Sequence, residues 1–409
     1  MVDDLACVSV CGVDTVKMNG YINAKTNVKK LQFGHEKCHR MHIGRKTCYC
    51  PDLFIDNWKV EPISDFIANP EGIGDILEGE VKMDNSDEEK YLGDLITADR
   101  SNTKNIKARK AKGFGIVDSI ISMLDTVFFG PFFFETAIIL RSSFLINSIL
   151  LNSEVWYGVT KAETEELEVV DQALLKRILE APSTTPTPML YLELGCLPIR
   201  YIIISRRIMY LHYLLTQDED ALLSRFFKAQ MENPVQGDWI EQIKIDIEEI
   251  KLNLTMDSIK MLSKEMLQKQ LKAAVQKTAF QYLIGEKEKR DKVKHVDHTH
   301  LRLQPYLCPG KLEIQEAKLL FQLRTRMIDV RENFKNKYQN TMCPVCMKNE
   351  KDTQAHVLEC SALVQNINMV MSSRVDFAQI FDSNVEKQLE VTRLFQHLWN
   401  IRKKIIDGQ

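Results

Sequence analysis

Four metal-binding side chains lie close together in the C-terminal part of the chain, in the order Cys343, Cys346, His356 and Cys360. A C-x2-C turn can aim two thiolates at one point, and a His and a Cys four residues apart on a helical turn can supply two more ligands. With ten Cys in 409 residues, a C-x2-C pair arises by chance roughly 0.2 times. The spacing therefore predicts a closed structural zinc site, with unrelated thiols as the alternative.

The composition favours a mainly helical globular protein of two to three domains. Hydrophobic residues make up 44% and charged residues 27%, with 17 Gly and 12 Pro, which excludes a disordered or fibrous chain. The 54 Lys and Arg against 56 Asp and Glu give a net charge of -2. A uniformly basic nucleic-acid binder is thereby excluded, whereas local basic patches are not.

No signal peptide or transmembrane segment is predicted. The chain starts with Met-Val-Asp-Asp rather than a basic and apolar leader, so its cysteines are expected to be reduced or metal-bound in the nucleus or cytoplasm. The most apolar stretch, 127–151, is interrupted by Glu135, Arg141 and Asn147. Because a charge near the centre of a membrane span is costly, this stretch is predicted to be a buried helix.

The pattern along the chain predicts short strands and turns over residues 1–60, including Leu5–Val10 and Met41–Gly44, and a loop over 61–90. From Thr103 the apolar period becomes helical. The charged segment 285–295 is predicted to be a solvated helix end or loop. The predicted helices span about 103–125, 132–157, 161–180, 198–214, 236–253, 255–285 and 311–335. One apolar face of the third helix comprises Leu167, Val170, Leu174, Leu175 and Ile178.

Three weaker features carry possible metal chemistry. The adjacent Asp3 and Asp4 precede a β-prone run and can hold divalent cations for phosphoryl transfer, although such pairs are usually solvated. His295, His298 and His300 occur in the charged loop, where solvated side chains are the simpler interpretation. A dense cluster without standard zinc spacing comprises His35, Cys38, His39, His42, Cys48 and Cys50.

Clustered cations predict contacts with nucleic-acid phosphates. The adjacent Arg206 and Arg207 have tyrosine neighbours, which suits phosphate contact or a core edge along which the side chains reach solvent. The helix that begins near Thr103 carries five cations, several of which share one side, and its alternative is an ordinary solvated face. These five are Lys104, Lys107, Arg109, Lys110 and Lys112.

In order along the chain, several motifs resemble the C-terminal part of the reverse transcriptase of non-LTR (LINE-like) retrotransposons. Met1–Ala6 resembles a divergent metal-binding motif with Asp3 and Asp4, although Met1 replaces the usual aromatic residue and Val2 the usual Ala. The Cys/His cluster and the residues leading into it are the most specific parts of the resemblance. The other similar segments are Leu31–Gly44, Tyr91–Ile96, Leu194–Ile199, Arg206–Leu211, Phe321–Met327 and Asn333–Tyr338.

The resemblance implies a mainly α chain with a palm remnant of short β-strands, a three-helix thumb-like bundle, a helical connector and a zinc knuckle. It implies RNA or DNA, as a primer–template duplex, as the partner. The expected segments are 1–60 (palm remnant), 61–97 (linker and strand), 98–185 (thumb), 186–335 (connector), 336–365 (zinc knuckle) and 366–409 (helical tail).

Three functional interpretations follow from the resemblance. The family's first catalytic aspartate and its fingers precede the segment that corresponds to Asp3, so the first interpretation is a reverse-transcriptase fragment that binds nucleic acid without polymerising. In the second, the chain is part of a longer active polymerase, and Mg²⁺ is a cofactor only with that complete catalytic core. The third is a domesticated helical zinc protein used for protein contacts.

Overall fold

The computed structural model forms two compact units, Met1–Ala108 and Arg109–Gln409. The mainly helical class predicted from the sequence is confirmed. The structure describes residues 17–22, 38–41, 54–56, 80–91, 93–99, 101–126, 130–346, 348–365, 376–382 and 384–407.

The described part of the first unit contains three pairs of short strands, and residues 17–22 are helical. The segment Tyr91–Ile96, expected as one strand, instead contains the turn of a hairpin, because Tyr91 pairs with Asp94 across it. Asp3, Asp4 and Leu5–Val10 lie outside the described residues. The antiparallel pairs are β2 (Phe54–Asp56) with β3 (Glu80–Lys82) and β5 (Glu88–Tyr91) with β6 (Asp94–Thr97), and the parallel pair is β1 (His39–Arg40) with β4 (Asp84–Asn85).

Helix α3 (Thr103–Thr126) has nearly the bounds predicted for it. Its residue Gly113 allows close packing in the second unit, since a Cβ there would lie 2.8 Å from Val170 Cγ1 and 3.0 Å from Ile149 Cγ2. The facing helix α6 (Lys161–Ile178) begins with a capping box in which Thr160 and Glu163 satisfy each other's backbone donors. All five residues of its predicted apolar face are fully buried, which confirms that part of the helical pattern.

The predicted helix 132–157 is wrong in its second half. After α4 (Phe133–Leu140) the chain widens into a π-helical turn, η2 (Arg141–Ile146), and α5 (Asn147–Ile149) ends soon afterwards. The π turn carries the buried Arg141, whose Nε and Nη2 each lie 2.6 Å from an oxygen of Asp171. Asn152 then adopts a left-handed conformation (φ 56) before the short η3 (Ser153–Val155), so the helix does not reach residue 157.

A bent pair of helices, α7 (Thr187–Leu194) and α8 (Ile199–Thr216), forms the centre of the second unit. Gly195 between them has φ +67, and a Cβ there would lie 2.3 Å from backbone atoms of Arg302 and Leu303. Only glycine fits this position without displacing backbone. Among the described residues no single helix has the length and apolar composition to cross a membrane, and this pair passes that test only when both helices are taken together.

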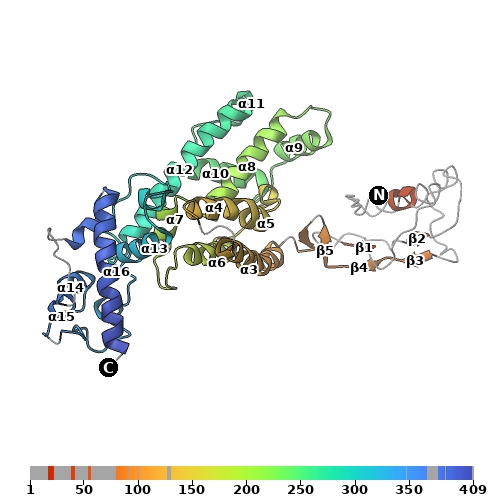
Figure 1. The fold of residues 1–409 in the computed structure, drawn as a ribbon. Coiled ribbons are helices and arrows are strands. Elements are labelled where there is room, and N and C mark those ends of the chain that lie inside the picture. The colour runs from red at the N-terminus through yellow and green to blue at the C-terminus, as the bar shows by residue number, and fades with distance from the viewer. Residues whose placement is uncertain are drawn as a thin grey trace. The chain divides into compact units, whose positions relative to one another are not determined.

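The remaining helices complete the second unit, and α16 packs against α13, α14 and α15 (Figure 1). The predicted helix 255–285 is two helices because Ser263 caps a new start, and the predicted 311–335 helix ends at Arg324. The helices are α9 (Leu222–Glu232), α10 (Trp239–Glu249), α11 (Met256–Met261), α12 (Lys264–Glu288), η4 (Pro305–Leu307), α13 (Ile314–Arg324), η5 (Arg331–Phe334), α14 (Gln354–Glu359), α15 (Ser361–Val364), η6 (Phe377–Phe381) and α16 (Val385–Asp407).

The charged segment 285–295 contains the end of α12 and is solvated only in part. Five of its charged residues are exposed, namely Glu288, Lys289, Arg290, Asp291 and Lys294. Val293, however, is fully buried, and the buried Lys287 donates a 2.5 Å hydrogen bond to the carbonyl of Val296. The predicted solvated helix end or loop is therefore correct for the exposed residues and wrong for these two.

Candidate metal centre

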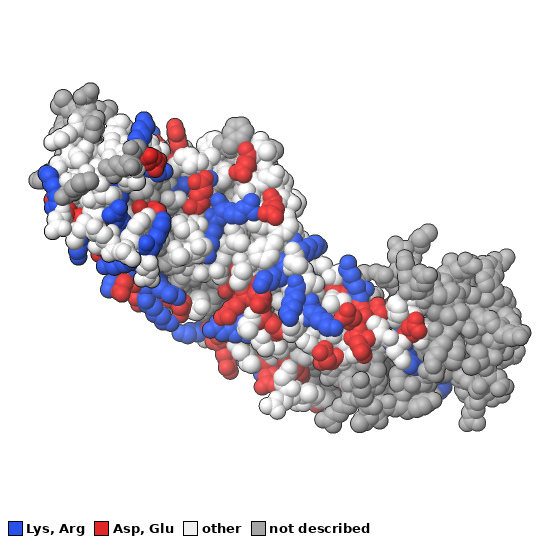
Figure 2. Space-filling model, turned by 90° about the horizontal axis from the view of Figure 1, so that it is seen from below, with Lys and Arg blue, Asp and Glu red and all other residues white. Residues whose placement is uncertain are grey.

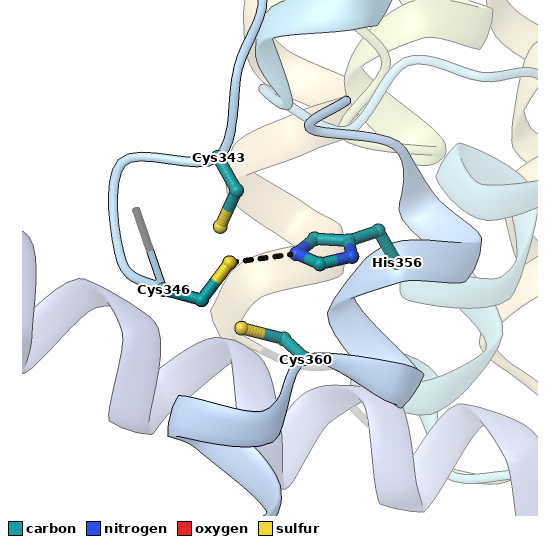
Figure 3. Close-up of side chains that lie close together, drawn as sticks. All are labelled: Cys343, Cys346, His356 and Cys360. Carbon is teal, nitrogen blue, oxygen red and sulfur yellow. Dashed lines mark hydrogen bonds between the residues drawn. The ribbon is translucent and has the colours of Figure 1, made fainter. Parts of the chain in front are cut away.

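Cys343, Cys346, His356 and Cys360 come together as the spacing predicts (Figure 3). One ligand atom from each residue, three Sγ and one imidazole nitrogen, lies within 4.8 Å of all the others. Cys346 Sγ and His356 Nε2 are 3.5 Å apart. Three of the four residues are buried, and Cys346 is half-buried. The arrangement can therefore hold a metal ion in a closed site.

A short antiparallel connection presents the first two cysteines. Met342 and Lys351 form a β-bridge, and Cys343 donates its backbone N–H to the carbonyl of Glu350 at 2.8 Å. The backbone N–H of Val345 points at Cys343 Sγ from 3.4 Å. Such N–H···S contacts stabilise a thiolate, because they place a donor beside its charge.

Helix α14 presents the other two ligands. Thr353 caps this helix by accepting a 3.0 Å hydrogen bond from the N–H of His356, which fixes the histidine in the first turn. The helix ends at Cys360, where the extended backbone (φ -62, ψ 112) separates α14 from α15. The local caps thus decide which way both side chains point.

Charged neighbours surround the cluster. His356 Nδ1 lies 3.0 Å from a carboxylate oxygen of Glu350, which leaves Nε2 facing the cysteines and fits the usual support of a metal-bound histidine. Burial, followed by the neighbouring Cys343 and Cys346, raises the pKa of Cys360 to about 11. Without a metal, Cys360 therefore keeps a proton that a bound cation would displace.

Helix α16 supplies a contact that the spacing motif does not contain. The guanidinium of Arg402 places Nη1 4.0 Å from Cys343 Sγ and Nη2 2.7 Å from Asp352 Oδ2. Asp352 also accepts the backbone N–H of Arg331 at 2.8 Å. Arg402 is 3% exposed and Asp352 is fully buried. The C-terminal helix is thus packed into the cluster's surroundings rather than being a separate tail.

The predicted basic helix divides into exposed and buried cations. Lys104, Lys107 and Lys112 are exposed, whereas Lys110 is ion-paired with Glu166. Arg109 is 5% exposed, donates a 3.0 Å hydrogen bond to the carbonyl of Ser148 and lies over the Trp156 ring. Its side chain thus faces the core and is not exposed as the predicted phosphate contact would require.

The two predicted arginines of α8 also differ. Arg207 is 5% exposed and forms a buried ion pair with Asp246 at 2.9 Å, so its guanidinium also lies in the core and not at the surface where a phosphate contact was predicted. Arg206 donates hydrogen bonds to the carbonyl of Leu150 and, at 2.8 Å, to Asn147 Oδ1. Its partners are neutral, and it remains at the wall of a surface groove.

The histidines of the charged loop are largely internal. His298 has a fully buried side chain 3.2 Å from Glu193 Oε1, and His295 packs edge-on against Phe381 with ring centroids 4.7 Å apart. The carboxylate of Glu193 also accepts hydrogen bonds from the hydroxyl of Tyr306 at 2.9 Å and from Nε of Arg324 at 3.3 Å. The prediction of a solvated loop is wrong for His295 and His298, and only His300 is exposed.

Only part of the dense N-terminal cluster is described. His39 Nδ1 lies 2.8 Å from Glu89 Oε1, and burial raises the pKa of Cys38. In the described part of the cluster, His39 therefore has a carboxylate partner at Nδ1. Four members lie outside the described residues, namely His35, His42, Cys48 and Cys50.

The described surface in Figure 2 is mixed in charge, with Lys and Arg side chains interspersed among Asp and Glu rather than gathered into a single basic face.

Comparisons of the chain with protein-family models, curated proteins and solved structures found no match.

Proposed function

We propose that this chain is a fragment of a retrotransposon-encoded RNA-directed DNA polymerase (reverse transcriptase) that holds one structural Zn²⁺ and binds a primer–template duplex. The observation that supports this most directly is the Cys/His cluster, which follows a helical unit in the order that the resemblance implies. The exposed lysines near the start of α3 support the nucleic-acid part of the proposal.

The donor set favours zinc among metals. Tetrahedral Zn²⁺, with Zn–S about 2.3 Å and Zn–N about 2.0 Å, separates its ligand atoms by about 3.5–3.8 Å. The 3.5 Å between Cys346 Sγ and His356 Nε2 matches this separation, and small side-chain rotations would close the wider pairs. Thiolates select soft or borderline ions over Mg²⁺ and Ca²⁺. Three thiolates around Zn²⁺ leave a charge of -1, and the guanidinium of Arg402, which also pairs with Asp352, presents Nη1 to Cys343 Sγ.

Lysines are the side chains best placed to contact phosphates. In the described part of the chain, Lys107 and Lys112 on α3 and Lys348 in the cysteine loop are exposed and form no ion pair. By contrast, Lys104 is paired with Glu88 at 2.5 Å. A lysine without a carboxylate partner can neutralise a phosphate without first breaking an ion pair, so these three should contribute most to the salt dependence of binding.

The test is a triple variant, Lys107→Ala, Lys112→Ala and Lys348→Ala, in the zinc-loaded full chain. Binding of a labelled RNA–DNA hybrid is measured by fluorescence anisotropy between about 50 and about 200 mM salt. Each lost phosphate contact should remove about 0.9 from the slope of log K against log salt on B-DNA, so the triple variant should flatten it by about 2–3.

The matched control removes three exposed lysines that are paired on their own helix or turn, through Lys161→Ala, Lys289→Ala and Lys294→Ala. It changes net charge equally, so a general charge effect would flatten both slopes alike. Equal slopes for the two triple variants would contradict the proposed contacts, and hybrid binding no stronger than background would contradict nucleic-acid binding altogether.

The proposal includes no polymerisation by the 409-residue chain alone. Two-metal phosphoryl transfer needs carboxylates from more than one strand, and the resemblance assigns only Asp3 and Asp4 to this role. Primer extension on poly(rA) with Mg²⁺ or Mn²⁺ should give no product above background. Extension that Asp3→Ala abolishes would instead favour the chain as a working polymerase.

Protein contact is the second candidate function, and an exposed apolar face on α9 favours it. Leu222 and Phe226 are 67% and 65% exposed, and Leu223 on the same helix is 46% exposed. Exposed apolar side chains grouped in this way are typical of interaction surfaces. If hybrid binding is absent while the zinc site is loaded, this function gains over nucleic-acid binding.

A further inference from the structure

A groove of about 760 Å³ lies along one side of α8. Its floor and walls include Arg206, Tyr210 and Tyr213 of α8, Glu154 of η3 and Lys264 at the start of α12. A volume of this size is in the range of small-molecule sites. None of these residues belongs to the Cys/His cluster or to the exposed lysines of α3, so the groove is a separate feature.

On the aromatic side of the groove, Tyr210 is packed between other rings, whereas the ring of Tyr213 is partly exposed. Tyr210 and Tyr213 are stacked with centroids 5.9 Å apart and an interplanar angle of 21°. Tyr210 packs edge-on against Trp239 at 5.8 Å, and the indole of Trp239 donates a 2.8 Å hydrogen bond to the carbonyl of Glu154. Tyr213 is 45% exposed. A flat partner can therefore stack on Tyr213 without moving the rings behind it.

Two cations lie beside this platform. Arg206 is held by the carbonyl of Leu150 and the amide oxygen of Asn147, neither of which carries a charge. Lys264 is exposed, and in the described part of the chain neither Arg206 nor Lys264 has an ion-pair partner. The carboxylate of Glu154 is the only acidic group lining the groove, so the groove carries one excess positive charge when His212 is neutral.

The combination of an exposed ring and an unneutralised guanidinium matches an unpaired nucleotide. An acidic peptide would use the cations and leave the stacked tyrosines without a partner, whereas a base and its phosphate use both. A paired base in a duplex cannot stack on a side chain, because its faces are already covered by neighbouring bases. The groove therefore fits single strands better than duplex.

We propose that the α8 groove binds single-stranded nucleic acid, with one base stacked on Tyr213 and an adjacent phosphate held by Arg206 and Lys264. This inference rests on the proposed nucleic-acid role and extends it from duplex to an unpaired segment. Its contacts use the flat face of a base and a backbone phosphate, so strong sequence preference is not expected.

The test uses the zinc-loaded full chain and a labelled oligothymidylate of about 12 nucleotides, which cannot pair with itself. Tyr213→Ala should weaken its binding about 5- to 100-fold, the range for losing one stacked base. Tyr213→Phe retains the ring and should bind like the parent. Binding of the RNA–DNA hybrid should change less than about twofold in either variant.

Tyr282→Ala is the matched control, since Tyr282 is 43% exposed on α12 and does not line the groove. It should leave oligothymidylate binding unchanged. Equal losses for the Tyr213 and Tyr282 variants, or no loss for Tyr213→Ala, would overturn the groove proposal. A parent chain that binds hybrid but not oligothymidylate would overturn the groove proposal alone, whereas one that binds neither would overturn the proposed function as well.

Discussion

Replacing Arg402 by Met should weaken metal binding at a site whose four ligands are untouched. The side chains of Arg402 and Asp352 are 3% and 0% exposed and lie 2.7 Å apart. Breaking a buried ion pair costs about 3–5 kcal/mol, because one charge stays buried without its partner. Asp352 keeps the 2.8 Å hydrogen bond from Arg331, so the lower end, about 3 kcal/mol, is expected.

The same substitution removes the positive charge 4.0 Å from Cys343 Sγ. Loss of a group that supports a metal ligand typically lowers affinity about 10- to 100-fold. The zinc dissociation constant is measured by competition with a chromophoric chelator. Hydrogen exchange of the peptides covering α16 reports local stability in the same samples, and exchange there should accelerate in Arg402→Met.

Arg393→Met on the same helix is the control, because Arg393 is 58% exposed and pairs with Glu316, whose side chain is 9% exposed. It should cost less stability than Arg402→Met and leave zinc affinity unchanged. Adding Asp352→Asn to Arg402→Met should recover part of the lost stability, since the unpaired buried charge is removed. Zinc affinity within twofold of the parent, with unchanged exchange in α16, would refute the link between this helix and the cluster.

Three further outcomes are expected. Cys343→Ser with Cys360→Ser should reduce zinc content from one ion per chain to near zero by metal analysis, and unchanged content would exclude the cluster as the site. Burial, followed by the charges of Arg326 and Arg324, lowers the pKa of His295 from 6.5 to about 4. Because the lowered pKa favours the neutral ring in the folded state, the contribution of His295 to the free energy of unfolding is fully present above pH 6.5 and is lost as pH falls toward 4. In urea titrations, the parent chain should therefore lose more stability over this pH range than His295→Phe does. The difference should be about 1–2 kcal/mol after allowing for solvent screening. Gly195→Ala should lower the free energy of unfolding by more than about 3 kcal/mol in the same titrations, because its Cβ would overlap backbone atoms 2.3 Å away. A smaller loss would show that the loop relaxes.

Local patterns in the sequence predicted the elements whose contacts are local. The five apolar residues of α6 recur at helical spacing and are all fully buried, because a helix with one apolar stripe needs no further information to choose its inner face. The ligands Cys343 to Cys360 span a single hairpin and helix, so their spacing alone implied their meeting. Both predictions depend on residues less than two dozen positions apart.

Contacts between distant segments were not predictable in this way. Arg109 was grouped with the exposed lysines although its partner, the carbonyl of Ser148, is 39 residues away. His298 meets Glu193 across 105 residues, and Arg402 meets Cys343 across 59. The polar composition of 285–295 concealed the buried Val293, and no spacing rule links a C-terminal arginine to a cysteine loop.

Buried and exposed charged residues are expected to have different roles in this chain, the first in stability and the second in binding. Arginine forms the buried pairs, which join helices distant in sequence, since its planar fork can satisfy a carboxylate with two hydrogen bonds. Such pairs fix which segments meet, so their loss should lower the stability of the fold, and at Arg402–Asp352 it should lower zinc affinity as well. The exposed cations without a partner in the described part of the chain include lysines, whose loss should change binding with little effect on folding. The buried pairs are Arg141–Asp171, Arg207–Asp246, Arg324–Glu193 and Arg402–Asp352. Arg206 has neutral hydrogen-bond partners and lies at a groove wall. Its substitution should therefore affect nucleic-acid binding more than folding, as is expected for the exposed lysines.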